Sequence, residues 1–419
     1  MKNHPLLLTL RHLRGNARGC VLTEPLWGIP FNLYAPYASI YMLAFGMNDA
    51  QIGLIASVGM LFQVFWTLLS GAITDKLGRK RTTLIFDIIS WSVPTLIWAV
   101  AQNYTYFLVA AIVNAVWRVT QNSWNCLLVE DTEPHLLVDI YSWIYIAGLL
   151  SAFVAPATGL FVGRFGLVPT VRALYLLAFV MMTAKFITLN ALATETQQGR
   201  VRMQETHKLP LFSILQGSGS VLRIIRHSPA TLYTAGLMIL LSIVSTISGT
   251  FWSILVVEEL QISATYIAIY PFVRSIMMLI FFFFIMPRVR STHVHKPMIY
   301  GLLGLVVSYI ILISTPPGNY RILFLATALE GFSVPAAFTL FDTLTVTTVN
   351  ATERARIMAL LNLAVILCTS PFGWIAGQLS ALDRRYPFML IIGGLLLSGM
   401  LTYLAGRARA HPANPPCDA

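Results

Sequence analysis

Five polar side chains recur at steps of three and four within an apolar segment: Asn114, Arg118, Gln121, Asn122 and Asn125. In a helix this spacing places them on one face. Amide and guanidinium groups bind solutes through hydrogen bonds, and an arginine also pairs with carboxylates. The face therefore predicts either a water-filled cavity that binds a solute or a polar seam between helices.

A carboxyl group in a second apolar segment could complete this chemistry. Tyr104 and Tyr320 each open a similar sequence, 216 residues apart, and the same offset takes Asn114 to Glu330. We expect Arg118 and Glu330 to pair, and Glu330 to take up and release a proton as its surroundings change. The alternatives are a static ion pair and a Glu330 that bonds only within its own bundle of helices.

Weaker signals come from isolated residues in other apolar segments. Tyr34 and Tyr37 line one side of an expected first helix, and Trp252 lies beside a face rich in Ser and Thr. These aromatic residues are predicted as substrate contacts or as core. Asp87 is a further proton-coupling candidate beside Arg118 and Glu330, whereas Lys185 is expected to extend toward the membrane surface.

A dense polar turn between two apolar segments holds most of the local charge. Residues 71–82 include Lys76, Arg79, Lys80 and Arg81. Cations that directly follow and precede apolar runs mark the cytoplasmic side of a membrane hairpin. Glu130 and Asp131 end another apolar segment at the same expected depth, so these carboxylates are natural partners for the cations.

Composition shows which elements must position these residues. The chain has 57% hydrophobic and 11% charged residues, against about 25% charged residues in soluble proteins. A chain of this composition cannot cover its apolar surface with polar side chains, and it is therefore predicted to be a polytopic membrane protein.

Segments of about 20 apolar residues suffice to cross a bilayer. We expect twelve membrane helices: residues 22–46, 50–74, 82–102, 104–129, 138–162, 169–192, 231–257, 263–286, 297–314, 320–348, 355–379 and 387–406. With both termini in the cytoplasm, most Lys and Arg residues fall on the cytoplasmic side, as the positive-inside rule requires. Because these cations are spread over short loops, the net charge of +11 does not indicate nucleic-acid binding.

The turn resembles the loop between the second and third helices of major facilitator superfamily transporters. It matches the pattern G-x-x-x-D-x-x-G-R-K through Gly71, Asp75, Gly78, Arg79 and Lys80. The sequence Arg118-x-x-Gln121 is similar to the R-x-x-Q-G-x-G motif of the fourth helix in that family, although Asn122 and Trp124 occupy its two glycine positions. The resemblance covers about residues 20–406.

The resemblance implies two related six-helix bundles, with substrate bound between them near the middle of the membrane. It also implies a cytoplasmic gate in which Asp75 and Arg79 join the inner ends of helices, with Glu130 or Asp131 as acceptor. The domains expected are a cytoplasmic tail (1–21), an N-terminal bundle (22–192), a linker with an amphipathic helix (193–230), a C-terminal bundle (231–406) and a second cytoplasmic tail (407–419).

The function expected is secondary active transport of a small or medium-sized organic solute across the plasma membrane by alternating access, coupled to protons. Efflux of amphipathic compounds is favoured slightly over uptake of a polar or anionic metabolite. A transporter-like receptor or scaffold and a lipid flippase are alternatives from other classes. No enzymatic activity, metal, cofactor or nucleic-acid partner is expected, and the protein is predicted to act as a monomer in the lipid bilayer.

Overall fold

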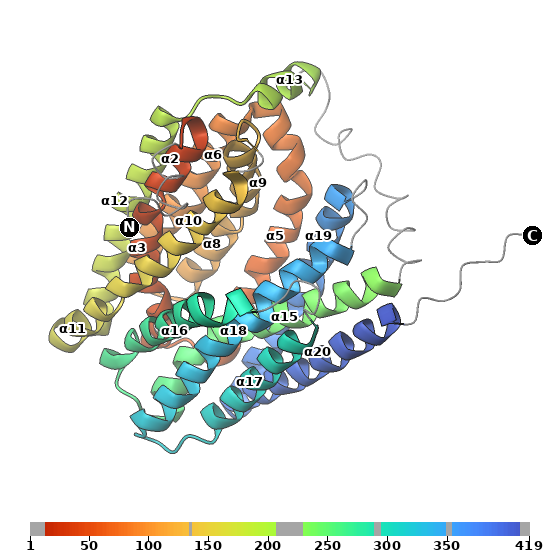
Figure 1. Ribbon diagram of the computed structural model, residues 1–419. Helices are drawn as coiled ribbons and strands as arrows, with labels where there is room; N and C mark the ends of the chain where they lie inside the picture. The colour runs from red at the N-terminus through yellow and green to blue at the C-terminus, as the bar shows by residue number, and fades with distance from the viewer. Residues whose placement is uncertain (1–12, 134–135, 207–228, 289–294, 349–353, 411–419) are drawn as a thin grey trace, which may run out of the picture. The chain divides into compact units, whose positions relative to one another are not determined.

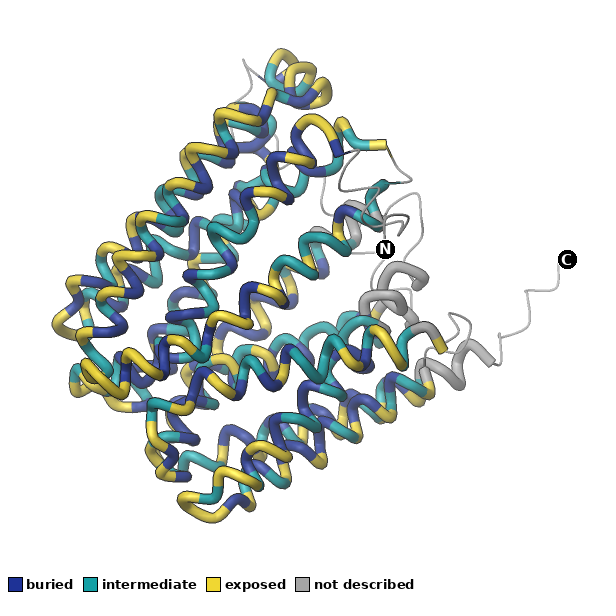
Figure 2. Tube along the Cα trace, turned by 60° about the vertical axis from the view of Figure 1, so that its left-hand side comes forward, coloured by how far each residue is buried: buried dark blue, intermediate teal, exposed yellow. Residues whose placement is uncertain are grey.

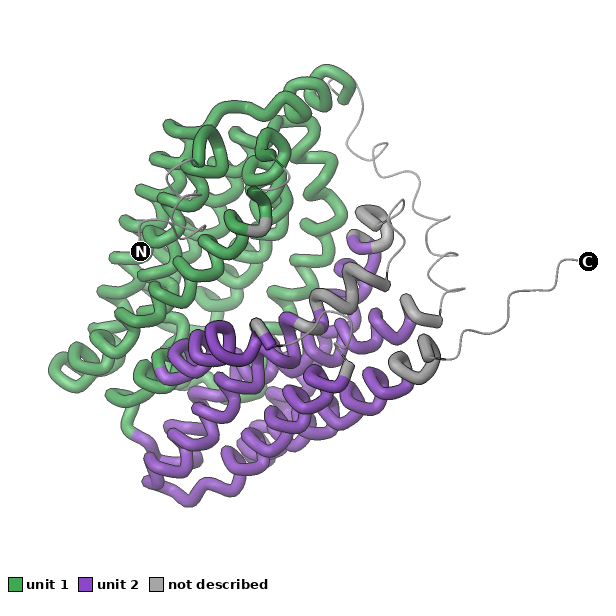
Figure 3. The backbone as a smooth tube through the Cα atoms, viewed as in Figure 1, with its two compact units in different colours: residues 1–216, 263–272 green, residues 217–262, 273–419 purple. Residues whose placement is uncertain are grey.

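The computed structural model describes residues 13–133, 136–206, 229–288, 295–348 and 354–410. Within these ranges it contains helices and no strand (Figure 1), as the all-α prediction requires. The chain divides into two compact units, one of residues 1–216 with 263–272 and one of residues 217–262 with 273–419 (Figure 3). The segment predicted as the N-terminal bundle lies in the first unit, and most of the predicted C-terminal bundle lies in the second.

The first unit is a bundle of helices joined by short connections. Its α-helices are α2 (Gly15–Thr23), α3 (Pro25–Tyr34), α4 (Ala38–Ala44), α5 (Asp49–Leu77), α6 (Arg79–Asp87), α7 (Val93–Ala99), α8 (Tyr104–Asn114), α9 (Trp117–Val129), α10 (Leu137–Ser151), α11 (Pro156–Phe165), α12 (Leu167–Leu192) and α13 (Gln197–Thr206).

The second unit is also helical. Its principal helices are α15 (Pro229–Ile254), α16 (Ile269–Ile280), whose first turn is grouped with the first unit, α17 (His295–Ile313), α18 (Tyr320–Thr348), α19 (Arg354–Leu382) and α20 (Tyr386–Ala410).

Prolines and a wide turn divide several helices of the first unit. Pro25 follows the break between α2 and α3, and Pro36 lies in the short 3-10 helix between α3 and α4. A proline cannot donate the backbone hydrogen bond that continues a helix. The chain passes from α6 to α7 through a π-helical turn, Ile88–Ser92, directly after Asp87. Such turns occur frequently at functional positions.

Ten helical stretches in the described ranges are long and apolar enough to cross a membrane. The predicted spans 22–46 and 104–129 are not among the ten, because each is divided into shorter helices. Prolines divide the first, and a turn at Ala115 and Val116 separates α8 from α9 in the second. The interrupted span 104–129 is the one that carries the polar face.

Large apolar side chains on these helices remain exposed in the absence of a bilayer. Examples are Leu160, Val180 and Phe283, which are 76%, 62% and 71% exposed. Figure 2 shows exposed residues repeating along the helices beside buried ones. Lipid chains can cover such side chains in a membrane protein, so this surface agrees with the multi-pass assignment.

The first helix begins earlier than the sequence predicted. Residues 15–21, assigned to a cytoplasmic tail, belong to α2, and Ala17, Cys20 and Val21 are buried in a cluster with Leu128 of α9 and Leu189 of α12. Hydropathy misses this start because α2 alternates apolar with small and polar residues. Its burial depends on the helices that it packs against.

The linker between the predicted bundles is described only in its first part. There the chain forms α13, Gln197–Thr206, which is drawn beside the end of α5 in Figure 1. The amphipathic helix expected from Leu209 to Arg226 falls wholly on residues 207–228, which lie outside the described residues.

Candidate functional site

Arg118 lies at the centre of a small polar group on α5 and α9. Its Nε donates to Oε1 of Gln63 at 2.9 Å, and its Nη1 donates to Oε1 of Gln121 at 2.9 Å. The guanidinium stacks over the ring of Trp117, 4.1 Å from the ring centroid. Arg118 is half-buried and Gln121 is exposed. Contact between such polar groups and lipid would cost free energy. An exposed amide beside a cation on these helices therefore indicates a surface that faces water.

The other members of the predicted polar face have different surroundings. Nδ2 of Asn114 donates to the backbone oxygen of Ser90 at 2.7 Å, and Nδ2 of Asn122 donates to Oγ1 of Thr74 at 3.2 Å. These bonds join α8 to the π-helical turn and α9 to α5. Asn125 is half-buried. The face thus combines both sequence alternatives, with a helix seam at Asn114 and Asn122 and an open polar surface at Gln121.

The aromatic candidates are less open than a substrate surface would be. Tyr34 is 4% exposed and lies 4.8 Å, between ring centroids, from Tyr175 of α12. Tyr37 is fully buried, whereas Trp252 of α15 is half-buried. The two tyrosines therefore pack in the first unit as core residues do, and substrate contact by any of the three stays a prediction.

Glu330 bonds within its own unit. Its Oε1 lies 3.3 Å from Nη1 of Arg274 on α16, and the hydroxyl of Tyr309 on α17 donates to it at 3.4 Å. Gly331 permits this arrangement, because a Cβ there would come within 2.7 Å of the backbone oxygen of Arg274. These contacts agree with the alternative in which Glu330 bonds within its own bundle. A pair between Glu330 and Arg118 would join the two units, and it stays a prediction.

Arg79 holds a network of carboxylates at one end of the first bundle. Its Nε lies 3.0 and 3.1 Å from the two carboxylate oxygens of Glu130, and Nη2 lies 2.9 Å from Oε1 of Glu130. Its Nη1 donates to Oδ1 of Asp75 at 3.0 Å. Arg79 is 4% exposed. Of the two predicted acceptors, Glu130 takes the pair, while the exposed Asp131 accepts from the backbone N–H of Gln197 at 3.3 Å.

Glu195 completes this network, although no motif or periodicity in the sequence singles it out. Its carboxylate accepts from the backbone N–H of Arg79 at 2.8 Å and of Lys80 at 3.1 Å. These two groups open α6, where Gly78 has a φ of +84° and provides no side-chain cap. Glu195 therefore caps α6 from a position 116 residues away in the chain.

Helix α13 adds further bonds to the same network. Nη2 of Arg202 lies 3.2 Å from Oδ2 of Asp75, and the hydroxyl of Thr206 donates to the backbone oxygen of Asp75 at 3.2 Å. The hydroxyl of Thr196, just before α13, donates to Oε2 of Glu130 at 2.5 Å. Bonds to Glu205 and Asp75 raise the pKa of the Arg202 guanidinium. We call residues 195–206 the linker clasp.

A second charged group is buried inside the first unit. Nζ of Lys185 on α12 lies 2.8 Å from Oε2 of Glu24 at the start of α3. The ammonium also lies 5.7 Å from the ring centroids of both Trp27 and Trp124. Lys185 is 6% exposed. The prediction that Lys185 extends to the membrane surface is therefore wrong. Its ammonium group lies inside the bundle, where one carboxylate and two aromatic rings stabilise its charge.

Asp87 belongs to this buried group. It is 6% exposed, interacts electrostatically with Lys185 and Glu24, and is hydrogen-bonded to the hydroxyl of Thr120 on α9. We call Glu24, Asp87 and Lys185 the buried charge cluster. Asp87 was predicted as a candidate, whereas Glu24 was not, because its only sequence signal is a carboxylate at the edge of an apolar segment.

A comparison with family profiles decides the classification. The profile described as Major Facilitator Superfamily matches residues 27–365. The chain belongs to this superfamily. Both the Arg118 group and the Arg79–Glu130 pair fall inside the matched residues, whereas Glu24 lies just before them. No curated protein sequence matches the chain.

Solved structures of transporters share the fold of this superfamily member. A bacterial homologue of the human lysosomal transporter Spinster, inward-facing and unoccupied, aligns with a TM-score of 0.72 and 15% identity, over 98% of this chain and 99% of the other. The nucleoside transporter NupG aligns at 0.69 with 14% identity, over 94% and 99%. The POT-family transporter PepTSo aligns at 0.69 with 12% identity, over 95% and 99%. At these identities the likeness concerns the fold.

Proposed function

We propose that the protein is a secondary active transporter of the plasma membrane that moves a small or medium-sized organic solute by alternating access, coupled to protons. The observation that carries the proposal is the group of Arg118, Gln63 and Gln121, a partly exposed cation with fixed amide partners on membrane helices. A static structural ion would be closed off from water, whereas this group presents an exposed amide. The protein acts as a monomer with both termini in the cytoplasm.

A polar or anionic solute fits this group better than an amphipathic one. An arginine whose direction is set by Gln63 and Gln121 can offer its remaining N–H groups to a carboxylate or phosphate. The aromatic residues that favoured efflux of amphipathic compounds include Tyr34 and Tyr37, which are buried. Nucleosides and peptides, named for two structural neighbours, are thus reasonable first solutes to test beside organic anions.

The Arg79 network supports the part of the proposal that concerns alternating access. Exposed ion pairs contribute only about 0 to 1 kcal/mol each, but these pairs are largely buried and share one arginine. Such a network favours one state of a carrier, and it can still open when a bound solute stabilises the other state by more than the pairs contribute. Asp75, Arg79 and Glu130 therefore act as the cytoplasmic gate, with Glu195 and Arg202 of the linker clasp as additional members.

Solute accumulation in proteoliposomes tests the proposal. Vesicles with an imposed pH gradient are given radiolabelled nucleosides, a labelled dipeptide, a labelled dicarboxylate or a fluorescent amphipathic cation. We expect accumulation of at least one of them, which disappears when a protonophore collapses the gradient. Arg118→Gln should lower uptake about tenfold or more, since the loss of one charge-assisted bond of about 1.4 kcal/mol corresponds to a factor of ten.

Arg321→Gln is the matched control for Arg118→Gln. Arg321 is an exposed cation at the start of α18, away from the Arg118 group and the linker clasp, and its substitution should leave uptake unchanged. Absence of gradient-driven accumulation for every solute class would contradict the proposal. Movement of labelled lipid in the same vesicles, without solute uptake, would indicate a flippase instead.

A further inference from the structure

The buried charge cluster has an unbalanced charge when all its members are ionised. Glu24 and Asp87 each contribute a negative charge and Lys185 contributes one positive charge, so the sum is −1. A net charge inside a bundle of apolar helices costs free energy, whereas a neutral group of bonded side chains costs much less. One proton on either carboxyl group makes the cluster neutral.

The contacts within the cluster favour Asp87 as the proton acceptor. Glu24 is engaged directly by the ammonium of Lys185 at 2.8 Å, which stabilises its ionised form. Asp87 has the hydroxyl of Thr120 as a partner and interacts electrostatically with Cys20, whose thiol carries no positive charge. The groups facing Asp87 are thus Lys185 from α12, Thr120 from α9, and Cys20 and Glu24 from the first helices.

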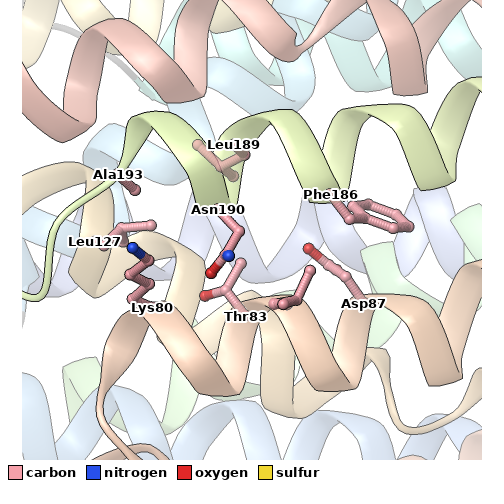
Figure 4. Close-up of a pocket in the computed structure, with 9 residues that line it drawn as sticks. Lys80, Thr83, Asp87, Leu127, Phe186, Leu189, Asn190 and Ala193 are labelled. Atoms are coloured by element: carbon pink, nitrogen blue, oxygen red, sulfur yellow. The ribbon is translucent and has the colours of Figure 1, made fainter.

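A small cavity leads to Asp87 from the end of the bundle that carries the gate. It lies between α6 and α12 and has a volume of about 10 Å³. On α6 it is lined by Lys80, Thr83, Leu84 and Asp87, which share one helix face. Figure 4 shows this face opposite Phe186, Leu189, Asn190 and Ala193, with the Asp87 carboxyl group at one end and Lys80 at the other.

The dimensions of the cavity suit a proton path. Seven residues of helix, from Lys80 to Asp87, span roughly 10 Å at 1.5 Å per residue. A cavity of roughly 10 to 15 Å³ is the smallest that holds one water molecule. Polar groups lie along it, at the side chains of Thr83 and Asn190. One water molecule joins partners about 5 to 6 Å apart, so it covers part of this length, and the side chains of Lys80, Thr83 and Asp87 reach toward it from the same helix face. Water and these side chains together can pass protons between the inner aqueous phase and the carboxyl group.

We infer that Asp87 is a proton-binding site of this transporter and that it exchanges protons with the cytoplasm through the cavity between α6 and α12. Glu24 and Lys185 form a neutral pair, so a proton on Asp87 makes the whole cluster neutral. The inference rests on the proposed proton-coupled transport and names the coupling residue. On uptake, a hydronium ion in the cavity transfers its proton to a carboxylate oxygen of Asp87 and remains as water. On release, the O–H bond of Asp87 breaks and water accepts the proton.

Infrared difference spectroscopy of the full-length protein in vesicles tests this site without any solute. The C=O stretch of protonated carboxyl groups is measured at neutral pH, and the charge balance predicts its area. The wild-type cluster holds one protonated carboxyl, Asp87→Asn and Glu24→Gln hold none, and Lys185→Met holds two. Glu258→Gln, at an exposed carboxylate just after α15, is the matched control and keeps the wild-type area.

The proton path is tested by hydrogen exchange. On transfer of the vesicles to heavy water, the wild-type band should shift to its deuterated position. Asn190→Leu fills the polar part of the cavity and should slow this shift at least tenfold while leaving the band area unchanged. A shift as fast as in the wild type would refute the path.

Two results separate this inference from the proposed function. An Asp87→Asn spectrum identical to that of the wild type, together with gradient-driven solute uptake, would overturn the proton site and leave transport standing. Band areas that follow the charge balance, without uptake of any solute, would support the site and refute the transport proposal. Glu24→Gln gives the same band loss by a different substitution, so the charge balance does not depend on one variant folding. Carbon-13 labelling of the aspartate carboxyl groups should shift the wild-type band, and a band that stays in place would assign the proton to Glu24 and overturn the inference.

Discussion

At the scale of single residues, Arg79 shows how one side chain can organise one end of a membrane bundle. Its guanidinium reaches both oxygens of Glu130 and one oxygen of Asp75, while its backbone N–H is held by Glu195. A planar guanidinium with several donors can serve several carboxylate oxygens in this way. A lysine presents a single nitrogen and cannot keep the same geometry.

Arg79→Lys should therefore destabilise the protein although it conserves the charge. We expect a loss of about 1 to 3 kcal/mol, because bonds to charged groups have this magnitude and Glu130 or Asp75 would lose a buried partner. The measurement is thermal unfolding of the purified protein, followed by tryptophan fluorescence. The matched substitution Arg81→Lys, at an exposed neighbour, should change stability by less than about 0.5 kcal/mol. Equal shifts for the two variants would contradict this account of Arg79.

The residues found and missed from the sequence differ in how far apart their partners lie. Asp75 and Arg79 are four residues apart in a dense turn, so spacing alone indicated them. Glu24 and Lys185 are separated by 161 residues. Helical periodicity tells which residues share a face, but the partner of that face depends on how helices pack. The Arg118 face was thus predicted, while its contact with Gln63 was not.

At the scale of an element, α6 begins under unfavourable electrostatic conditions. Its first turn carries Arg79, Lys80 and Arg81 and no acidic residue, although the positive end of a helix dipole favours negative charge. The carboxylate of Glu195 corrects this by bonding the N–H groups of Arg79 and Lys80. The linker clasp therefore stabilises the start of α6 as well as the Arg79–Glu130 pair, which we propose as the gate.

Gly78→Ala should disrupt this junction. Gly78 has φ +84° and ψ 161°, a backbone region that costs residues other than glycine about 1 to 3 kcal/mol. A Cβ there would also meet Oε2 of Glu195 at 2.5 Å and the sulfur of Met203 at 2.8 Å. We expect a lower melting temperature and faster proteolysis of the linker clasp.

Gly71→Ala is the control within the same turn pattern. A Cβ at Gly71 meets nothing within 4 Å, and the residue lies inside α5. An alanine in a helix interior is favoured over glycine by roughly 0.5 to 1 kcal/mol, so stability should stay constant or rise. The two glycines of one sequence pattern thus have different physical roles, and a loss of stability at Gly71 rather than Gly78 would show that this assignment is wrong.

At the scale of the whole molecule, composition and segment length predicted a helical membrane protein, and the superfamily match confirms the class. The positions of helix interruptions were harder to predict. In the predicted first span, Pro25 begins a new helix and Pro36 lies in a 3-10 turn, so the span is a series of shorter helices, whereas Pro30 lies inside α3. Hydropathy averages over such breaks, since it measures apolar content and is insensitive to backbone hydrogen bonding.

Alternating access predicts that the Arg118 face is open to each aqueous phase in turn and that the gate sets the balance. In a variant without native cysteines, Gln121→Cys should react with a membrane-impermeant maleimide in both right-side-out and inside-out vesicles. Adding Glu130→Gln removes the charged acceptor of Arg79, so labelling from the inside should rise and labelling from the outside should fall. A bias of about 1.4 kcal/mol changes the ratio of the two labelling rates tenfold.

Two control positions should stay unlabelled in every preparation. They are Val119→Cys, which is fully buried on the same helix, and Val180→Cys, which is 62% exposed on the apolar surface of α12. Reaction of Gln121→Cys from one side only, with a rate that Glu130→Gln leaves unchanged, would remove the physical basis for a gated carrier.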